Sequence, residues 1–386
     1  MTSKTFLKDI TSAASVENMM RSFAPEKNIR VNHISTFTID NSASILMALA
    51  EAGTQNPYGH FGLDVTYSED GKERKRKMVM KVKPHGDTMV NLVNSLSVAC
   101  GEKLNSVYRN YKTLTGFQQT HLREQEIYTK LKPAIAPNIY GVVTDASENV
   151  FAVLMEYLDD VLLLNSVMQL ELWTDEYIKA TLKQLAEWHA FTMNNNIELE
   201  KALFNDMPSL RSMTHLMPAL HALLDNAASY FPGLYTEENV KTGKKIIGSV
   251  PEYWQQLEQL PKAFIHNDCN PRNICFKKVA DQQRLCIYDW ELATFHIPQY
   301  DVAEFLCFVL DEDRYHLRKE YVAYYRGILH AHTGRHPDAT KFYNEFLLAA
   351  NDFGIQRLGL YMMAHKVSPY PFIPRVVKSF FDTVRN

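Results

Sequence analysis

Residues 263–292 gather the side chains that are best suited to chemistry. His266, Asp268 and Asn273 lie in one loop, and Asp289 ends a later apolar run. The segments that flank the loop are apolar, which predicts short buried strands. Strands that leave and enter one loop would bring two carboxylates and an amide to one place. The predicted strands are residues 263–265, 274–276 and 285–288.

The spacing of these residues resembles a known catalytic loop. Asp268 and Asn273 are five positions apart, as in the H-x-D-x-x-x-x-N loop of protein kinases, and Asp289 stands about where their metal-binding aspartate follows. The segment resembles the catalytic core of the aminoglycoside phosphotransferase and choline kinase superfamily of small-molecule kinases, close to its ecdysteroid-kinase-like branch. That superfamily commonly has glycine where Asn267 stands, and the filler before Asn273 is Cys-Asn-Pro-Arg. Neither departure removes a group that the chemistry needs.

The resemblance covers about residues 53–306 and is densest over 265–305. It implies an α+β, bilobal, protein-kinase-like fold. The N-lobe, residues 1–155, would be a small antiparallel β-sheet with an N-terminal helix, and the C-lobe, residues 156–386, would be larger and mostly helical. The chain exceeds the usual length of one compact domain, which agrees with two lobes. A hinge at the lobe boundary would hold adenine, so Met155 and Tyr157 are candidate nucleotide-binding residues.

The resemblance also assigns roles around the loop. Asp268 would accept a hydrogen bond from the acceptor hydroxyl and take its proton. Asn273 and Asp289 offer the hard oxygen ligands that Mg²⁺ prefers, so they are the candidate metal ligands as well as catalytic residues. His266 would brace the loop by hydrogen bonds.

A lysine in an apolar strand provides a further candidate. Residues 78–83 read Met-Val-Met-Lys-Val-Lys, and a buried lysine requires an anionic partner. Lys81 and Lys83 share one face of such a strand, so alternation alone does not choose between them. The resemblance favours Lys81 as the ligand of the α- and β-phosphates of ATP. Glu124 and Glu126 are candidates to pair with the lysine, and the family's E-x-x-x-Y pattern, matched by Glu124 and Tyr128, favours Glu124. The alternative is an exposed helix carboxylate.

Glycines precede the strand predicted at residues 63–67. Residues 53–62 form a turn-rich stretch in which Gly59 and Gly62 could let backbone N–H groups approach nucleotide phosphates. A plain loop is the equal alternative. Residues 68–71 then predict a turn, and the basic run 72–77 is interpreted as a solvated hairpin tip rather than a nucleic-acid patch.

The remaining patterns predict the surrounding elements. Helical spacing is expected within residues 1–30, over 101–131, over 175–193 and throughout the last 80 residues, and strands over 31–39, 136–143 and 150–158. Residues 45–52 fit either a strand or a helix, and residues 205–260 fit two or three helices. His189 lies on the apolar side of its helix and is interpreted as a core residue. Asp301 would cap a helix or support the catalytic loop.

Composition describes an ordinary globular protein. The 386 residues carry 41 basic and 44 acidic side chains, a net charge of −3, so neither nucleic acid nor an anionic membrane is an expected partner. Five scattered cysteines, mostly in apolar runs, predict reduced thiols and a cytoplasmic location. No run approaches 18 apolar residues, so neither export nor a membrane span is expected.

These patterns predict a small-molecule kinase that transfers the γ-phosphate of ATP, with Mg²⁺, to a hydroxyl of a metabolite, natural product or antibiotic-like acceptor. A nucleotide-binding pseudokinase and a protein kinase are the alternatives. The intact set of acid, amide and lysine argues against the first. The second lacks an A-P-E segment, and only twelve positions separate Asp289 from Asp301.

The acceptor has two open alternatives. The predicted C-lobe carries acidic residues that would suit a cationic acceptor such as an aminoglycoside or choline: Asp159, Asp160, Asp311, Glu312 and Asp313. It is also rich in aromatic residues, which would suit a sterol-like or other apolar alcohol. The sequence does not choose between them.

Overall fold

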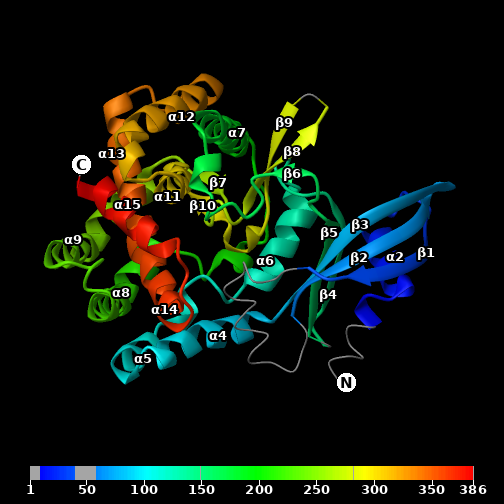
Figure 1. The fold of residues 1–386 in the computed structure, drawn as a ribbon, viewed down its shortest axis with the longest axis horizontal. Coiled ribbons are helices and arrows are strands. Elements are labelled where there is room, and N and C mark those ends of the chain that lie inside the picture. The colour runs from blue at the N-terminus through cyan, green and yellow to red at the C-terminus, as the bar shows by residue number, and fades with distance from the viewer. Residues whose placement is uncertain (1–8, 40–57, 148, 281, 386) are drawn as a thin grey trace.

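A five-stranded antiparallel sheet forms the N-terminal part of the molecule, and helices form most of the rest (Figure 1). The computed structural model describes residues 9–39, 58–147, 149–280 and 282–385. The sheet order is β1-β2-β3-β5-β4. Its strands are β1 (Ile29–Phe37), β2 (Gly59–Glu69), β3 (Lys72–Lys83), β4 (Ile139–Asp145) and β5 (Val150–Glu156). The fold is therefore α+β, as predicted. The predicted lobe boundary falls at the end of β5 and stays a prediction.

The hairpin between β2 and β3 confirms the predicted turn. Asp70 and Gly71 both have positive φ angles, 52° and 78°, which is the conformation that a tight two-residue hairpin turn requires. Two neighbouring predictions differ from the structure. Residues 72–77 are exposed, as expected, but they form the outer half of β3 rather than a hairpin tip. Residues 59–62 belong to β2 rather than to a loop.

Residues 59–62 belong to a strand because they pair with neighbouring strands. Gly62 is opposite Phe37 of β1 and Val79 of β3. A Cβ atom at Gly62 would lie 2.5 Å from the Phe37 ring, so the missing side chain allows the ring to pack against the strand. Gly59 has a φ of 140°, which suits glycine best, and it opposes Val82. Residues 45–52 and 53–57, for which predictions were also made, lie outside the described residues.

Helices cover the sheet and connect it to the C-terminal part. α2 (Ala13–Phe23), the predicted N-terminal helix, packs on β1 and β4. α4 (Gly86–Ala99) and α5 (Glu102–Tyr108) follow β3, run below the remaining helices in Figure 1, and contact α14 and α8 respectively. The predicted helical region 101–131 comprises α5, α6 (Thr120–Glu126), the 3₁₀ turn η1 (Lys112–Leu114) and the π-helix η2 (Ile127–Leu131). No prediction covered α4.

The C-terminal part holds two small sheets within a helical body. β7 (Ala263–Ile265) pairs with β10 (Thr294–His296), and β8 (Ile274–Val279) pairs with β6 (Val161–Leu162) and β9 (Gln282–Ile287). The predicted strands around the catalytic loop are thus present. The other elements of this part are η3 (Leu170–Leu172), α7 (Asp175–Asn194), η4 (Lys201–Phe204), α8 (Leu210–Tyr230), α9 (Glu237–Gly248), α10 (Val250–Gln259), η5 (Trp290–Leu292), α11 (Gln299–Val309), η6 (Glu312–Leu317), α12 (Arg318–Thr333), α13 (Ala339–Phe353), η7 (Gly354–Leu358), α14 (Gly359–Val367) and α15 (Ile373–Arg385).

The interior explains why the small strands hold their places. Phe264, Ile274 and Phe276 are fully buried, and Trp290 lies stacked near Phe264 with the ring planes 2° apart. All five cysteines are buried and none forms a disulfide, as the sequence predicted. Among the helices of the described residues, none combines the length and the apolar character needed to cross a membrane.

The start of α4 supplies a test of the packing. A Cβ atom at Gly86 would lie 1.5 Å from the backbone oxygen of Gln118, so Gly86→Ala must displace the backbone. We expect this change to lower the free energy of unfolding by roughly 2 kcal/mol or more, measured by urea denaturation. Gly248→Ala, at the end of α9 with no atom within 4 Å of the new Cβ, is the control and should cause no loss.

Candidate active site

The loop between β7 and β8 is held by carboxylates of α11. The Asp301 carboxylate accepts hydrogen bonds from the backbone N–H groups of His266 and Asn267, each at 2.8 Å. One turn later Glu304 accepts a bond from the Cys269 N–H at 2.9 Å. Asp301 is the third residue of α11. Through these two hydrogen bonds it supports the catalytic loop, which was one of the two predicted roles.

Asp301 is itself held by His189. His189 Nε2 lies 3.2 Å from the Asp301 carboxylate, and Nδ1 lies 2.6 Å from the Tyr325 hydroxyl. Burial raises the pKa of Asp301, but His189 and His266 together outweigh burial and hold the pKa below its ordinary value. His189 is fully buried with both ring nitrogens engaged, which agrees with the prediction of a core residue.

Asn267 is the residue at which the loop departs from the pattern that it resembles. Its φ of 61° is in the left-handed region, which asparagine tolerates better than most residues. The side-chain amide donates to the Leu292 carbonyl at 2.8 Å, so the strained conformation is fixed by a specific partner. The substitution therefore preserves the backbone geometry of the loop.

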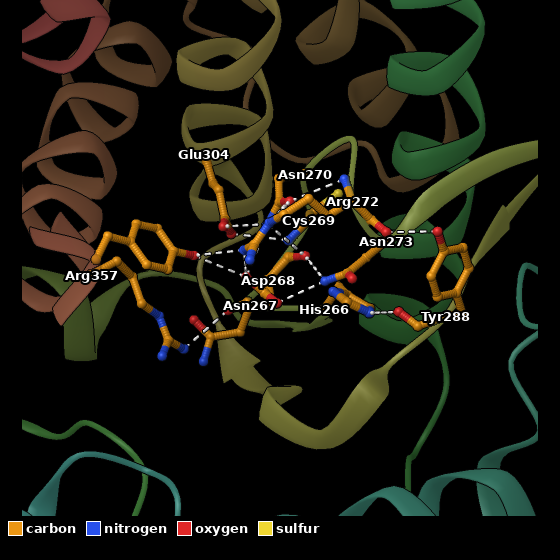
Figure 2. Close-up of polar contacts among 11 residues, drawn as sticks. His266, Asn267, Asp268, Cys269, Asn270, Arg272, Asn273, Tyr288, Glu304 and Arg357 are labelled. Carbon is orange, nitrogen blue, oxygen red and sulfur yellow. Dashed lines mark hydrogen bonds and ion pairs between the residues drawn. The ribbon is translucent and has the colours of Figure 1, made fainter. Parts of the chain in front are cut away.

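Asp268 projects from this loop into a set of polar contacts (Figure 2). Its Oδ2 accepts a hydrogen bond from Asn273 Nδ2 at 2.7 Å. Its Oδ1 accepts bonds from Asn270 Nδ2 at 2.9 Å and from the Tyr361 hydroxyl at 3.1 Å. Four residues thus orient one carboxylate, since the Arg272 guanidinium also lies 3.5 Å from Oδ1.

Asn273 is oriented by the same loop. Its amide nitrogen donates both to Asp268 Oδ2 and to the Asp268 carbonyl, the latter at 2.9 Å, which directs the amide oxygen elsewhere. The Tyr288 N–H donates to the Asn273 carbonyl at 3.0 Å and ties the loop to the segment that leads to Asp289. His266 Nε2 lies 3.0 Å from the Tyr288 carbonyl, so His266 braces this segment, as expected.

Lys81 joins the sheet to the C-terminal part. Its ammonium lies 2.8 Å from Glu124 Oε1 of α6 and 2.6 Å from Asp289 Oδ1. Burial lowers the pKa of Lys81, but these two carboxylates outweigh burial and raise it. Burial likewise raises the pKa of Asp289, but the Lys81 and Lys83 ammonium groups hold it well below its ordinary value. Since the pKa of Glu124 is also lowered, Lys81, Glu124 and Asp289 are all ionised at neutral pH.

Lys83 also contacts Glu124, so both candidate lysines use the same carboxylate. Its ammonium lies 2.9 Å from Glu124 Oε2 and forms an ion pair with Glu291. It also donates to the Thr120 carbonyl at 3.3 Å. Of the two lysines, Lys81 lines the cleft described below and contacts Asp289, whereas Lys83 is enclosed by its partners.

A cleft of about 450 Å³ lies between the sheet and the C-terminal part. It brings together Asp268, Asn273, Asp289 and Lys81, and also Met155 and Tyr157 at the end of β5. Glu124 lies behind Lys81. Gly59 and Gly62 are not among the described residues that line it. The strand residue between them, His60, does line it, and burial together with the Lys81 charge lowers its pKa to about 4. Lining residues that the sequence reasoning missed are His60, Arg272, Glu291, Arg357 and Tyr361.

The donor set near Asp289 fits a hard divalent cation. Glu124, Asp289 and Glu291 each offer an oxygen within 4.8 Å of the others, but Glu124 is engaged by both lysines. Asp289 keeps Oδ2, and Asn273 keeps its amide oxygen, without a hydrogen bond from the described residues. One carboxylate and one amide oxygen are typical of Mg²⁺ sites that are completed by water and phosphate.

The arrangement is that of a phosphoryl-transferring enzyme: a strand lysine paired with a helix glutamate faces an Asp–Asn loop across a cleft. Residues 109–343, more than half of the chain, match the family described as "Phosphotransferase enzyme family". The chain belongs to that family. No curated protein matches its sequence significantly.

Solved structures with a similar fold include three kinases or phosphotransferases of small molecules. An ethanolamine kinase from Plasmodium vivax is 14% identical over 91% of this chain and 81% of its own, with a TM-score of 0.49. An aminoglycoside 2'-phosphotransferase bound to GDP is 12% identical over 97% and 98%, with a TM-score of 0.45. A glucosamine kinase is 11% identical over 92% and 83%, with a TM-score of 0.41. These TM-scores are below 0.5, so membership of the family is supported by the sequence match over residues 109–343 and not by these structures.

Glu304 supplies a pH-dependent test of the loop support. Burial, and next the Asp268 charge, raise the pKa of Glu304 from 4.5 to about 8. The folded protein therefore binds a proton that the unfolded chain releases above pH 4.5, so stability must fall as pH rises toward 8. We expect the wild type to lose free energy of unfolding relative to Glu304→Gln between pH 5 and 8, measured by urea denaturation. The exposed Glu312→Gln control should show a constant difference from the wild type over the same range.

Proposed function

We propose that the protein is a small-molecule kinase that transfers the γ-phosphate of ATP, with Mg²⁺, to an alcohol. The supporting observation is that Lys81, Asp289, Asn273 and Asp268 line one cleft although they come from distant parts of the chain. Lys81 would neutralise phosphate charge, Asp289 and Asn273 would be metal ligands, and Asp268 would accept the proton. Their motifs also favour the ecdysteroid-kinase-like branch, and the buried reduced cysteines favour a cytoplasmic location.

The nucleotide would enter between β5 and the catalytic loop. Met155, Tyr157 and Leu158 line this end of the cleft. The Tyr157 N–H already donates to the Lys77 carbonyl at 3.2 Å, so it is engaged. The Leu158 N–H has no partner among the described residues, and it is the better candidate for an adenine contact. Lys81 would then neutralise the α- and β-phosphates.

Asp268 would act on the acceptor. The hydroxyl oxygen of the acceptor attacks the γ-phosphorus, the bond from that phosphorus to the β–γ bridging oxygen breaks, and the proton passes to the Asp268 carboxylate. Asn273 and Asp289 would hold Mg²⁺, which when bound neutralises charge on the β- and γ-phosphates. Tyr361 and Asn270 fix the Asp268 carboxylate, so it is oriented before the acceptor arrives.

Two rival functions are less well supported. A pseudokinase would be expected to lack one of the charged groups, and Lys81, Glu124, Asp268 and Asp289 are all present and oriented. A protein kinase needs a segment that receives a peptide after the metal-binding aspartate. Here the residues from Asp289 to Asp301 form η5, β10 and the start of α11, which leaves no such segment.

The role of Asp268 can be tested by substitution. Asp268→Ala removes the proton acceptor, and we expect Mg·ATP-dependent phosphorylation of any acceptor found in a screen of hydroxylated metabolites to fall by about 10² to 10⁴-fold. A thermal melt should show a folded protein, because the loop backbone is held by Asp301 and Glu304. Unchanged turnover would remove Asp268 from the mechanism.

The two lysines form a matched pair for the nucleotide site. Lys81→Met should weaken Mg·ATP binding by about tenfold or more, since a charge-assisted contact to phosphate is lost. Lys83→Met removes an equally buried ammonium that does not line the cleft, so its effect on Mg·ATP affinity should be small. Calorimetry with folded variants measures both. Equal losses in the two variants would contradict the assignment to Lys81.

Asp289→Ala tests the metal role directly. The variant loses the carboxylate that would hold Mg²⁺, so we expect ATP binding to become independent of Mg²⁺ and far weaker, measured by calorimetry with and without the metal. Glu238→Ala, an exposed carboxylate on α9, is the control. Mg²⁺-dependent binding that survives Asp289→Ala would rule out this ligand.

A further inference from the structure

The cleft extends beyond Asp268 into a region that has apolar walls. The side chains that line it there come from α4, α14, η5 and the segment before α6, and they are aliphatic or aromatic: Val93, Leu96, Phe117, Leu292, Leu360 and Ala364. The carboxylates that line the whole cleft are Glu156, Asp268, Asp289 and Glu291, of which Glu156 forms an ion pair with Lys277. The acidic residues considered for a cationic acceptor do not line it within the described residues. Asp311, for example, is paired with Arg314, and Asp160 with Lys278.

Arg357 is a buried cation at this end of the cleft. It lies on the π-helix η7, a rare helical form that is frequent at functional sites, and its exposed fraction is 5%. Its Nη2 donates to the Asn267 carbonyl at 3.0 Å, and Figure 2 shows the guanidinium beside Asn267, the neighbour of Asp268. Nε has no hydrogen-bond partner, and the guanidinium has no carboxylate within 4.0 Å in the described part of the chain.

A buried guanidinium with unused donors is costly unless an anion completes its contacts. Burial lowers the pKa of Arg357, but Tyr300, Tyr361, Asp268 and Glu304 together outweigh burial and raise it. Among the described residues, none of these acids forms an ion pair with the guanidinium. Asp268 is shared among Asn273, Asn270, Tyr361 and Arg272. The pKa of Glu304 is raised to about 8 by burial and by Asp268, so that carboxyl is mostly neutral near pH 7.

A second cation, Arg272, lies beside Asp268, 3.5 Å from Oδ1. The Arg272 guanidinium packs over the rings of Tyr361, Phe372 and Phe308, at 5.4, 5.6 and 5.9 Å from their centroids. Its Nε donates to Asn270 at 3.0 Å. Arg272 thus has several partners, whereas Arg357 has the Asn267 carbonyl and the Tyr300 side chain as neighbours and no paired carboxylate among the described residues. Two guanidinium groups therefore lie close to Asp268 (Figure 2), and each would disfavour an acceptor that carries a cation beside its hydroxyl.

We propose that the acceptor is an apolar alcohol that carries a carboxylate a few atoms from the hydroxyl, with the carboxylate bound by Arg357. The apolar remainder would lie against α4 and α14. This inference rests on the proposed function and narrows its acceptor class. Arg357 adjoins Asn267, so the anion and the hydroxyl held by Asp268 must be close together in the acceptor.

Three probes of equal length test the charge preference. They are 3-hydroxyoctanoate, octane-1,3-diol and 1-aminooctan-3-ol, which share the chain and the hydroxyl and differ only in the end group. Calorimetry with the full-length wild type should give binding of the hydroxy acid that is about tenfold or more tighter than that of the diol, and the amine should bind most weakly. Equal binding of acid and diol, tighter binding of the amine, or no binding of any probe would overturn the proposal.

Substitution of Arg357 separates binding of an anion from simple support of the loop. Arg357→Gln should remove the advantage of the hydroxy acid and leave diol affinity unchanged, and Arg357→Lys should restore part of it. The control is Arg326→Gln, which removes an arginine that donates to backbone carbonyls of residues 336 and 337 far from the cleft. Equal weakening of all probes by Arg357→Gln would mean that Arg357 only braces the loop. If that variant does not fold, the wild-type comparison of the three probes still decides.

Mg·ATP binding to the wild type, measured separately, distinguishes the two proposals. If Mg·ATP binds and the probes show no charge preference, only the acceptor inference fails. If Mg·ATP does not bind, the kinase proposal itself fails, whatever the probes do.

Discussion

The Lys81 ammonium and its two carboxylates constrain the whole molecule. A lysine that is 6% exposed would be strongly destabilising alone, and it is tolerated because Glu124 and Asp289 surround it. Those partners belong to α6 and to the segment after β9, while Lys81 belongs to β3. The two ion pairs of Lys81 therefore connect the sheet, helix α6 and the C-terminal part. A phosphate that reached Lys81 would exchange with Asp289 and free its carboxylate for a metal.

The catalytic loop depends on a second set of buried acidic side chains. Asp301 and Glu304 are three residues apart on α11, so both face the loop from one side of the helix. They bind backbone N–H groups, which makes the loop conformation insensitive to most of its own side chains. The filler Cys269 to Arg272 can then differ from the family's pattern without disturbing Asp268 or Asn273. Asn267 is the exception, since its positive φ suits few residues.

Much of the site could be predicted because its chemistry is local in sequence. Short strands with clear apolar patterns separate Asp268, Asn273 and Asp289. Lys81 is recognisable in β3 because it is a charged residue among apolar ones. Arg357 and Tyr361 could not be found in this way, because they reach the cleft from helices that follow Asn273 by more than 80 residues. The glycines of β2 misled the prediction for a different reason: pairing with β1 and β3 overrides their turn propensity. The amphipathic spacing of α4 was available in the sequence, with Met89, Val93 and Leu96 on its buried face, and no prediction used it.

The short path from Asp289 to Asp301 has a further consequence. Its residues are committed to η5, β10 and the first turn of α11, and the Lys81–Glu124 pair is already closed. Most of this stretch is regular secondary structure, so it offers no long loop of the kind that a covalent modification could reorder. For the proposed reaction, throughput would follow the supply of nucleotide and acceptor and the abundance of the protein itself, as in a metabolic enzyme rather than a signalling relay.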